Sequence, residues 1–213
     1  MLKIENLFVN DALRGASLEV HAGARALCRG ENGAGKTTLV QAIIGNADYP
    51  VRSGKIFFDG VDITDKPTDE RARMGIFVGG QNVPEIPGLS VMTFLKHSFQ
   101  AHYPSLPMSE FMNRLNDAEA ELGIPGSWLA REANVGFSGG EKKRLMFLHL
   151  LLLRPKFAIL DEPDSGADKS AIKKFGEIID GMKGTTFLVV SHLGAFFEQT
   201  AEISLQDGKI IVE

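Results

Sequence analysis

The sequence is poor in the features that mark secreted or membrane-embedded proteins. Its 213 residues include one cysteine, Cys28. One cysteine can form no disulfide within the chain, and it falls short of the roughly four ligands that an iron–sulfur cluster requires. Cys28 ends the apolar run Ala24–Cys28, which indicates a buried core thiol. We therefore expect a reducing compartment and a cytoplasmic protein.

Long apolar runs and a basic surplus are also missing. The most apolar stretch, Leu145–Leu153, is far shorter than the roughly 20 residues that span a bilayer. Lys3, Glu5 and Asn6 interrupt the start of the chain, so no signal peptide is predicted. The net charge is −4, which argues against a dedicated nucleic-acid binder. We expect a soluble protein with no direct membrane contact and no nucleic-acid partner.

Strand-like and helix-like segments alternate along the chain, which predicts an α/β domain. Wholly apolar strands such as Phe157–Leu160 and Thr186–Val190 are typical of the centre of a parallel sheet. Between residues 81 and 138 the pattern of the sequence changes: several prolines occur, and two segments have apolar residues at helical spacing. The sequence therefore predicts one domain, residues 1–213, with a helical lobe inserted at about residues 84–154. Asp207-Gly208 predicts a hairpin turn near the end.

A glycine-rich loop between an apolar strand and a helix predicts a phosphate site. The segment Gly30-Glu31-Asn32-Gly33-Ala34-Gly35-Lys36-Thr37 fits the pattern G-x-x-x-x-G-K-[ST]. Glycines let successive amides point inward, and the helix N-terminus adds its dipole. We expect Lys36 to reach the β- and γ-phosphates of ATP, Thr37 to coordinate Mg²⁺, and Thr38 to join the nucleotide site. A glycine turn that occurred by chance would not be expected to have both an apolar strand before it and a helix after it.

Two acids and a histidine follow strand-like segments. Asp161 ends an apolar strand, where it can hold Mg²⁺ through water, and Glu162 comes next, where it can polarise an attacking water. A solvated acidic turn is the alternative for this pair. His192 follows another apolar strand, at the sheet edge where ligands bind in such folds. It can sense the γ-phosphate, although a purely structural histidine remains the alternative.

The segment Ser138-Gly139-Gly140-Glu141 fits a capping box at a helix start. That pattern leaves the two glycines unexplained, since each costs about 1 kcal/mol relative to alanine within a helix. Bare glycine amides make sense where an anion approaches closely. The following Lys142, Lys143 and Arg144 either reinforce this field or face solvent.

In this order the motifs resemble an ABC-type ATPase over essentially the whole chain. The resemblance implies a P-loop NTPase core with a mostly parallel sheet, an N-terminal antiparallel β lobe and an inserted helical lobe. It also implies an ATP-dependent head-to-tail homodimer, in which one subunit's P-loop faces the other's Ser-Gly-Gly signature. In chain order, it implies that Gln81 contacts Mg²⁺ and its water, and that Ser138 and Gly140 touch the γ-phosphate in trans with Gly139 in the same site. It also implies that Asp161 binds the metal, that Glu162 is the general base, that Asp168 links the two sites, and that His192 is the switch.

Within that superfamily the chain resembles the SufC ATPases of iron–sulfur cluster assembly. The similarity lies in Gly75-Ile76-Phe77, Glu85-Ile86-Pro87-Gly88, the stretch from Asn134 to Arg144, and Asp164-Ser165-Gly166. It implies a SufB- or SufD-like scaffold bound near the Gln81 loop and Glu85–Gly88. The sequence departs from SufC proteins at Pro163, Ala167 and Asn82, and Phe8–Leu13 offers no clear aromatic to stack on adenine.

Three alternatives stay open at this point. The ATP-binding subunit of an ABC transporter would use the same chemistry with a membrane partner. A P-loop kinase would phosphorylate a small molecule and would not need Ser138-Gly139-Gly140. A regulatory subunit that does not hydrolyse ATP is disfavoured, because Glu162 and His192 are both present.

Overall fold

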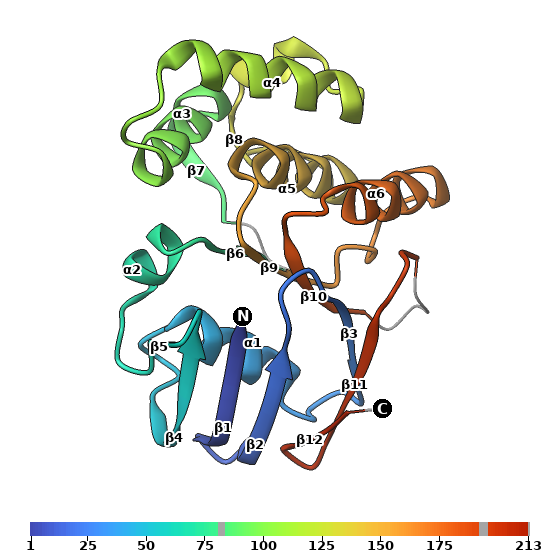
Figure 1. Ribbon diagram of the computed structural model, residues 1–213. Coiled ribbons are helices and arrows are strands. Elements are labelled where there is room, and N and C mark those ends of the chain that lie inside the picture. The colour runs from blue at the N-terminus through green and yellow to red at the C-terminus, as the bar shows by residue number, and fades with distance from the viewer. Residues whose placement is uncertain (81–83, 192–195, 213) are drawn as a thin grey trace.

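The computed structural model describes residues 1–80, 84–191 and 196–212, and its central layer is a six-stranded sheet (Figure 1). β12 pairs antiparallel with β11, and the other neighbouring strands are parallel. The mostly parallel sheet and the hairpin at Asp207-Gly208 are therefore confirmed. The strands, in sheet order, are β12 (Lys209–Val212), β11 (Ala201–Gln206), β3 (Arg25–Gly30), β10 (Thr186–Val190), β9 (Phe157–Asp161) and β6 (Ile76–Gly79).

A second, antiparallel sheet forms from the N-terminal part of the chain, as predicted. Its buried positions alternate along the strands, so that one face packs inward. Helix α1 (Lys36–Ile44) lies between this sheet and the parallel one, and the short helix α2 (Thr68–Arg73) precedes β6. The strands, in sheet order, are β2 (Leu13–Val20), β1 (Leu2–Val9), β4 (Val51–Phe58) and β5 (Val61–Asp62).

Both faces of the central strands β9 and β10 are buried, which explains why these two strands are apolar at almost every position. Alternate residues of β10 point to opposite faces. Leu188 and Val190 pack with α1 and the antiparallel sheet, whereas Phe187 and Val189 pack with the helices on the other side. The strands therefore separate two hydrophobic clusters and hold their carboxyl ends at one common edge.

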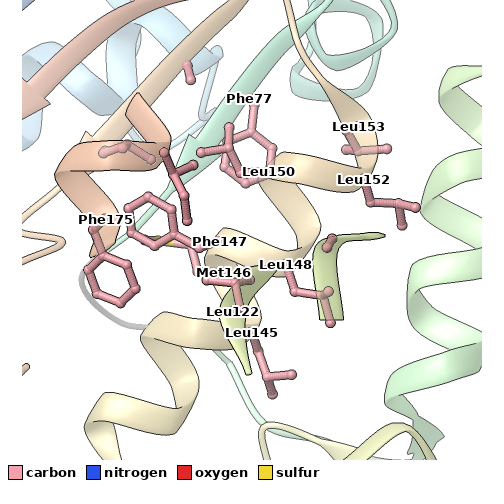
Figure 2. Packing of buried hydrophobic residues seen from close by; sticks show 14 of the residues in the cluster. Phe77, Leu122, Leu145, Met146, Phe147, Leu148, Leu150, Leu152, Leu153 and Phe175 are labelled. Carbon is pink, nitrogen blue, oxygen red and sulfur yellow. The ribbon is translucent and has the colours of Figure 1, made fainter. Parts of the chain in front are cut away.

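Helices cover the second face of the parallel sheet, with α5 and α6 next to it and α3 and α4 further out (Figure 1). The rings of Phe147 on α5 and Phe175 on α6 stack with centroids 4.0 Å apart (Figure 2). Among the described residues no helix is both long and apolar enough to cross a membrane. The elements, in chain order, are β7 (Ile86–Ser90), α3 (Val91–His102), α4 (Met108–Leu122), the 3₁₀ helix η1 (Gly126–Ala130), β8 (Glu132–Ala133), α5 (Gly139–Leu153) and α6 (Lys169–Gly181).

The helical segments predicted at 91–99 and 111–122 lie within α3 and α4. The sequence patterns missed α2, η1 and the β7–β8 pair, because each is too short to show a period. β7 and β8 pair through Ile86 and Ala133, which are 47 positions apart in the chain (133 − 86). The boundary of a helical lobe at about residues 84–154 stays a prediction.

Candidate functional site

The glycine-rich loop joins β3 to α1, and its glycines are required by backbone geometry. Gly33 and Gly35 have φ values of 84° and 106°, which residues with a side chain rarely adopt. A Cβ on Gly30 would lie 2.6 Å from the carbonyl oxygen of Leu205, and one on Gly35 would lie 2.9 Å from that of Ala12. The loop can therefore curl tightly where β3 leads into the N-terminus of α1.

A cavity of about 530 Å³ opens over this loop. Lys36 is only 8% exposed, and its Nζ donates to the carbonyl oxygens of Gly30 and Glu31. The ammonium group is therefore held across the loop by neutral acceptors. A phosphate oxygen would be a stronger, charged acceptor for the same donor. The lining residues are Ala12, Glu31, Asn32, Gly33, Gly35, Lys36, Thr37, Thr38 and Glu162.

Asp161 and Glu162 lie at the carboxyl edge of the sheet with the glycine-rich loop. β10 alone separates β9 from β3, and all three strands are parallel. Asp161 is 8% exposed at the end of β9. Glu162 turns the chain with φ 50° and lines the same cavity as Lys36 and Thr37. The fold therefore brings the predicted water-activating residue and the predicted phosphate-binding lysine to one cavity.

Magnesium fits the chemistry of the residues present, because the Thr37 hydroxyl and the Asp161 carboxylate are hard oxygen donors. In the described part of the chain, no group of three His, Cys, Asp or Glu side chains could hold a metal ion. Phosphate oxygens and water would have to supply the remaining ligands, as in other nucleotide-bound magnesium sites.

Lys143 contacts the turn that carries Glu162, a link that the sequence patterns did not predict. It is 5% exposed, and its Nζ donates to the carbonyl oxygen of Glu162 at 2.6 Å. Burial lowers the pKa of Lys143, while the charges of Asp161, Asp164 and Glu162 raise it. A signal was available: Lys143 lies three, four and seven positions before the buried residues at 146, 147 and 150, which is the spacing of one helix face.

Lys142 and Lys143 differ in their surroundings, so neither lysine fits the simple choice between a reinforcing field and solvent. Lys142 Nζ lies 2.9 Å from a carboxylate oxygen of Glu85. This ion pair joins the start of α5 to the segment that precedes β7. Lys143 instead joins the same helix to the turn after β9.

The signature segment forms the predicted capping box at the start of α5. Ser138 Oγ accepts from the amide of Glu141 at 3.3 Å, and Glu141 Oε2 accepts from the amide of Ser138 at 2.8 Å. A Cβ on Gly139 would meet nothing within 4 Å, and one on Gly140 would meet only the Gly166 carbonyl oxygen at 3.9 Å. Packing within the described chain therefore does not require either glycine.

Asp168 has a local structural role at the start of α6. Its Oδ1 accepts a hydrogen bond from the amide of Ala171 at 2.9 Å, which makes it the N-cap of that helix. Its predicted part between two ATP sites is not tested by this contact and stays a prediction. Gln81 and His192 lie outside the described residues.

A glycine-rich loop at a helix N-terminus, with an acid pair on a nearby parallel strand, defines the P-loop class of nucleotide-binding proteins. Within that class, the family model "ABC transporter" matches residues 13–165. A probable ABC transporter ATP-binding protein of Streptococcus pyogenes serotype M3 is 40% identical over 201 residues, covering 90% of this chain and 78% of the relative. The probable ATP-dependent transporter SufC of Escherichia coli is 37% identical over 203 residues, covering 90% and 82%.

Solved structures agree with this placement. An ATP-binding subunit of an ABC transporter, 26% identical, superposes with a TM-score of 0.86 and covers 99% of this chain and 88% of its own. A post-hydrolysis dimer of the ATP-binding cassette MJ0796, 20% identical, has a TM-score of 0.87 over 100% of this chain and 98% of its own, and shows the fold alone. The chain therefore belongs to the ABC ATPase family, whose P-loop enzymes bind and hydrolyse ATP.

Proposed function

We propose that two copies of this chain bind ATP head to tail, with the signature of one copy completing the P-loop site of the other. The observation that carries this proposal is the bare start of α5. Ser138 and Gly139 are exposed, and a Cβ on either glycine would have no close neighbour. The described residues that line the cavity over the glycine-rich loop, here called the phosphate cavity, do not include residues 138, 139 or 140 of the same chain. A phosphate of another subunit's nucleotide is a suitable ligand for these amides.

In the proposed mechanism, the side chains that line or border the cavity have separate roles. Lys36 moves its ammonium group from the loop carbonyls to the β- and γ-phosphates. Glu162 accepts a proton from the water that attacks the γ-phosphorus, while the bond from that phosphorus to the β–γ bridging oxygen breaks. The products are ADP and inorganic phosphate. Mg²⁺, held by Thr37 and Asp161, would neutralise charge on the phosphate oxygens.

Hydrolysis would be coupled to movement through the stability of the dimer. ATP favours the closed dimer only by as much as it binds that state better than the open one. Loss of the bridging γ-phosphate removes the contact to Ser138 and Gly140 of the second subunit. The dimer then opens, and a scaffold that is attached to both subunits changes shape.

For the attached protein we propose a SufB- or SufD-like scaffold of iron–sulfur cluster assembly. The similarity to SufC of Escherichia coli supports this, as does 34% identity over 195 residues to the iron–sulfur cluster assembly protein SufC of Plasmodium falciparum. Glu85, Pro87 and Gly88 are exposed, so this surface is available to a partner. An adjacent cavity of about 310 Å³, lined mainly by apolar side chains, includes Pro84 and Asn134.

The ATP-binding subunit of an ABC transporter is the second candidate. The 40% identical relatives from Streptococcus pyogenes, described as probable ABC transporter ATP-binding proteins, favour it. Purification of the complex from the native cell separates the two functions. A scaffold protein that binds in stoichiometric amount supports the first, and a partner with several transmembrane helices overturns it.

Mixing two inactive variants tests the head-to-tail arrangement. Lys36→Ala disables the P-loop side of a site, and Gly140→Val blocks the signature side. A dimer of one copy each would retain one site with both sides intact, so the mixture should regain hydrolysis that neither variant has alone. Lys36→Ala mixed with Glu162→Gln is the matched control, because both changes damage the P-loop side and no intact site can form. Recovery in the control, or none in the test mixture, would contradict the arrangement.

Glu162→Gln alone tests the general base. We expect this variant to bind MgATP and to accumulate as an ATP-bound dimer, because the γ-phosphate is no longer removed. Size-exclusion chromatography with light scattering under saturating MgATP measures this. A monomer under those conditions, together with unchanged turnover, would count against Glu162 as the base.

A further inference from the structure

A buried carboxylate, that of Asp164, lies two residues after the proposed general base, Glu162. Asp164 is 4% exposed, and Ser191 is 1% exposed. Ser191 Oγ donates to Asp164 Oδ2 at 2.8 Å. This bond joins the turn that follows β9 to the residue that follows β10. It therefore ties together two neighbouring strand ends at the edge of the sheet where the phosphate cavity opens.

Glu162 sits inside the segment that this bond holds. Its amide donates to the carbonyl oxygen of Val190 at 2.8 Å, and its carbonyl oxygen accepts from the amide of Ser165 at 3.2 Å. The backbone of Glu162 has φ 50°, a conformation with a cost for a residue that has a side chain. Two side-chain contacts support that turn: Lys143 Nζ donates to the carbonyl oxygen of Glu162, and Ser191 Oγ donates to Asp164.

The Asp164 carboxylate is only partly satisfied by hydrogen bonds within the described chain. The second oxygen of the carboxylate, Oδ1, is buried with no hydrogen-bond partner among the described residues. An unpaired buried polar atom is unfavourable, and for a charged group the cost is greater. The charge of Lys143 offsets part of this cost, since Asp164 is among the carboxylates that raise the pKa of Lys143. The bond from Ser191 contributes something separate, which is a fixed position for the turn that carries Glu162.

We propose that Asp164 is a positioning residue for Glu162: its bond to Ser191 holds the turn at 162–165 on the end of β10, and so sets the place of the Glu162 carboxylate over the phosphate cavity. This inference rests on the proposed function, in which Glu162 activates water. Displacement of a catalytic group by about 1 Å can cost on the order of a hundredfold in rate. Nucleotide binding should not depend on the bond between Ser191 and Asp164, because the glycine-rich loop follows β3 and Lys36 begins α1, whereas this bond joins the ends of β9 and β10.

Three variants separate positioning from folding. Asp164→Ala and Ser191→Ala each remove the bond, whereas Asp164→Asn keeps an oxygen that can accept from Ser191. We expect the two alanine variants to lower kcat by about tenfold to a hundredfold, with KM for MgATP unchanged within about twofold. Asp164→Asn should recover most of the lost rate. Nucleotide affinity, measured by titration calorimetry in the presence of Mg²⁺, should match that of the unmodified protein in all three.

The outcomes are distinguishable. Unchanged kcat in both alanine variants overturns the inference, and so does a loss of nucleotide affinity that parallels the loss of rate. An Asp164→Asn variant as slow as Asp164→Ala also overturns it, because the bond would then not be the cause. Failure of the proposed function would give a different result. The unmodified protein would then either not hydrolyse ATP or hydrolyse it at a rate that Glu162→Gln does not change.

Discussion

Replacing Arg71 with alanine is expected to destabilise the fold by several kcal/mol, because this buried guanidinium closes the end of the helix that begins at the phosphate loop. Arg71 is 2% exposed. It donates to four backbone carbonyl oxygens, each at 2.8 Å, two near the end of α1 and two before α2. A Cβ on Gly45 would lie 2.7 Å from its Nε, so the helix ends in a glycine that gives this side chain room.

The magnitude follows from what the truncation leaves behind. The acceptors are the carbonyl oxygens of Ala42, Ile43, Thr64 and Lys66. A hydrogen bond from a charged donor contributes about 1.5–3 kcal/mol, so four unreplaced bonds would exceed the whole stability of many domains. A cavity of about 330 Å³ borders Arg71, and water entering through it would satisfy some carbonyls. We therefore expect a net loss of about 3–5 kcal/mol.

Equilibrium unfolding in urea, followed by circular dichroism, measures this loss. Arg73→Ala is the matched control, since Arg73 lies on the same helix, is exposed, and pairs with Asp69 at the surface. A surface pair of this kind is worth at most about 1 kcal/mol. Arg71→Lys should recover only part of the loss, because one ammonium group cannot reach all four carbonyls. A loss in Arg71→Ala no larger than that in Arg73→Ala would refute the reasoning.

Three other side chains give further tests. Lys36→Ala should abolish nucleotide binding in titration calorimetry, and a normal affinity would remove the P-loop assignment. Burial lowers the pKa of His149 from 6.5 to about 4, helped by the charge of His102. Between pH 6.5 and 4 the unfolded state therefore binds more protons at this position than the folded state does. The free energy of unfolding should fall as the pH is lowered through this range, and it should fall less in His149→Gln than in the unmodified protein. Burial raises the pKa of Cys28 to about 12, so disulfide reagents should label it only on unfolding; rapid labelling at neutral pH would contradict its burial.

Much of the site was visible in short stretches of sequence, because its signals are local. The glycine-rich loop needs only consecutive residues and a helix start, and in the structure Lys36 begins that helix and lines the cavity over the loop. The capping box of Ser138 and Glu141 likewise spans one helical turn. Apolar strands such as β9 and β10 were readable because both of their faces are buried.

Other features depend on which segments become neighbours, and no local pattern carries that information. Lys143 contacts Glu162 across 19 positions, Asp164 contacts Ser191 across 27, and Arg71 contacts Ala42 across 29. Each contact forms because the order of the strands brings distant chain segments to one sheet edge or one helix end.

The sequence by itself determined the class of chemistry, since phosphate binding by a loop and helix start is encoded in consecutive residues. Only the tertiary structure decided which residues surround the glycine-rich loop and the start of α5. It places Glu162 over the P-loop of its own chain and leaves Gly139 and Gly140 without close neighbours. Strand order and helix packing set these relations, because burial of both faces of the sheet is satisfied by the whole fold and not by any one segment.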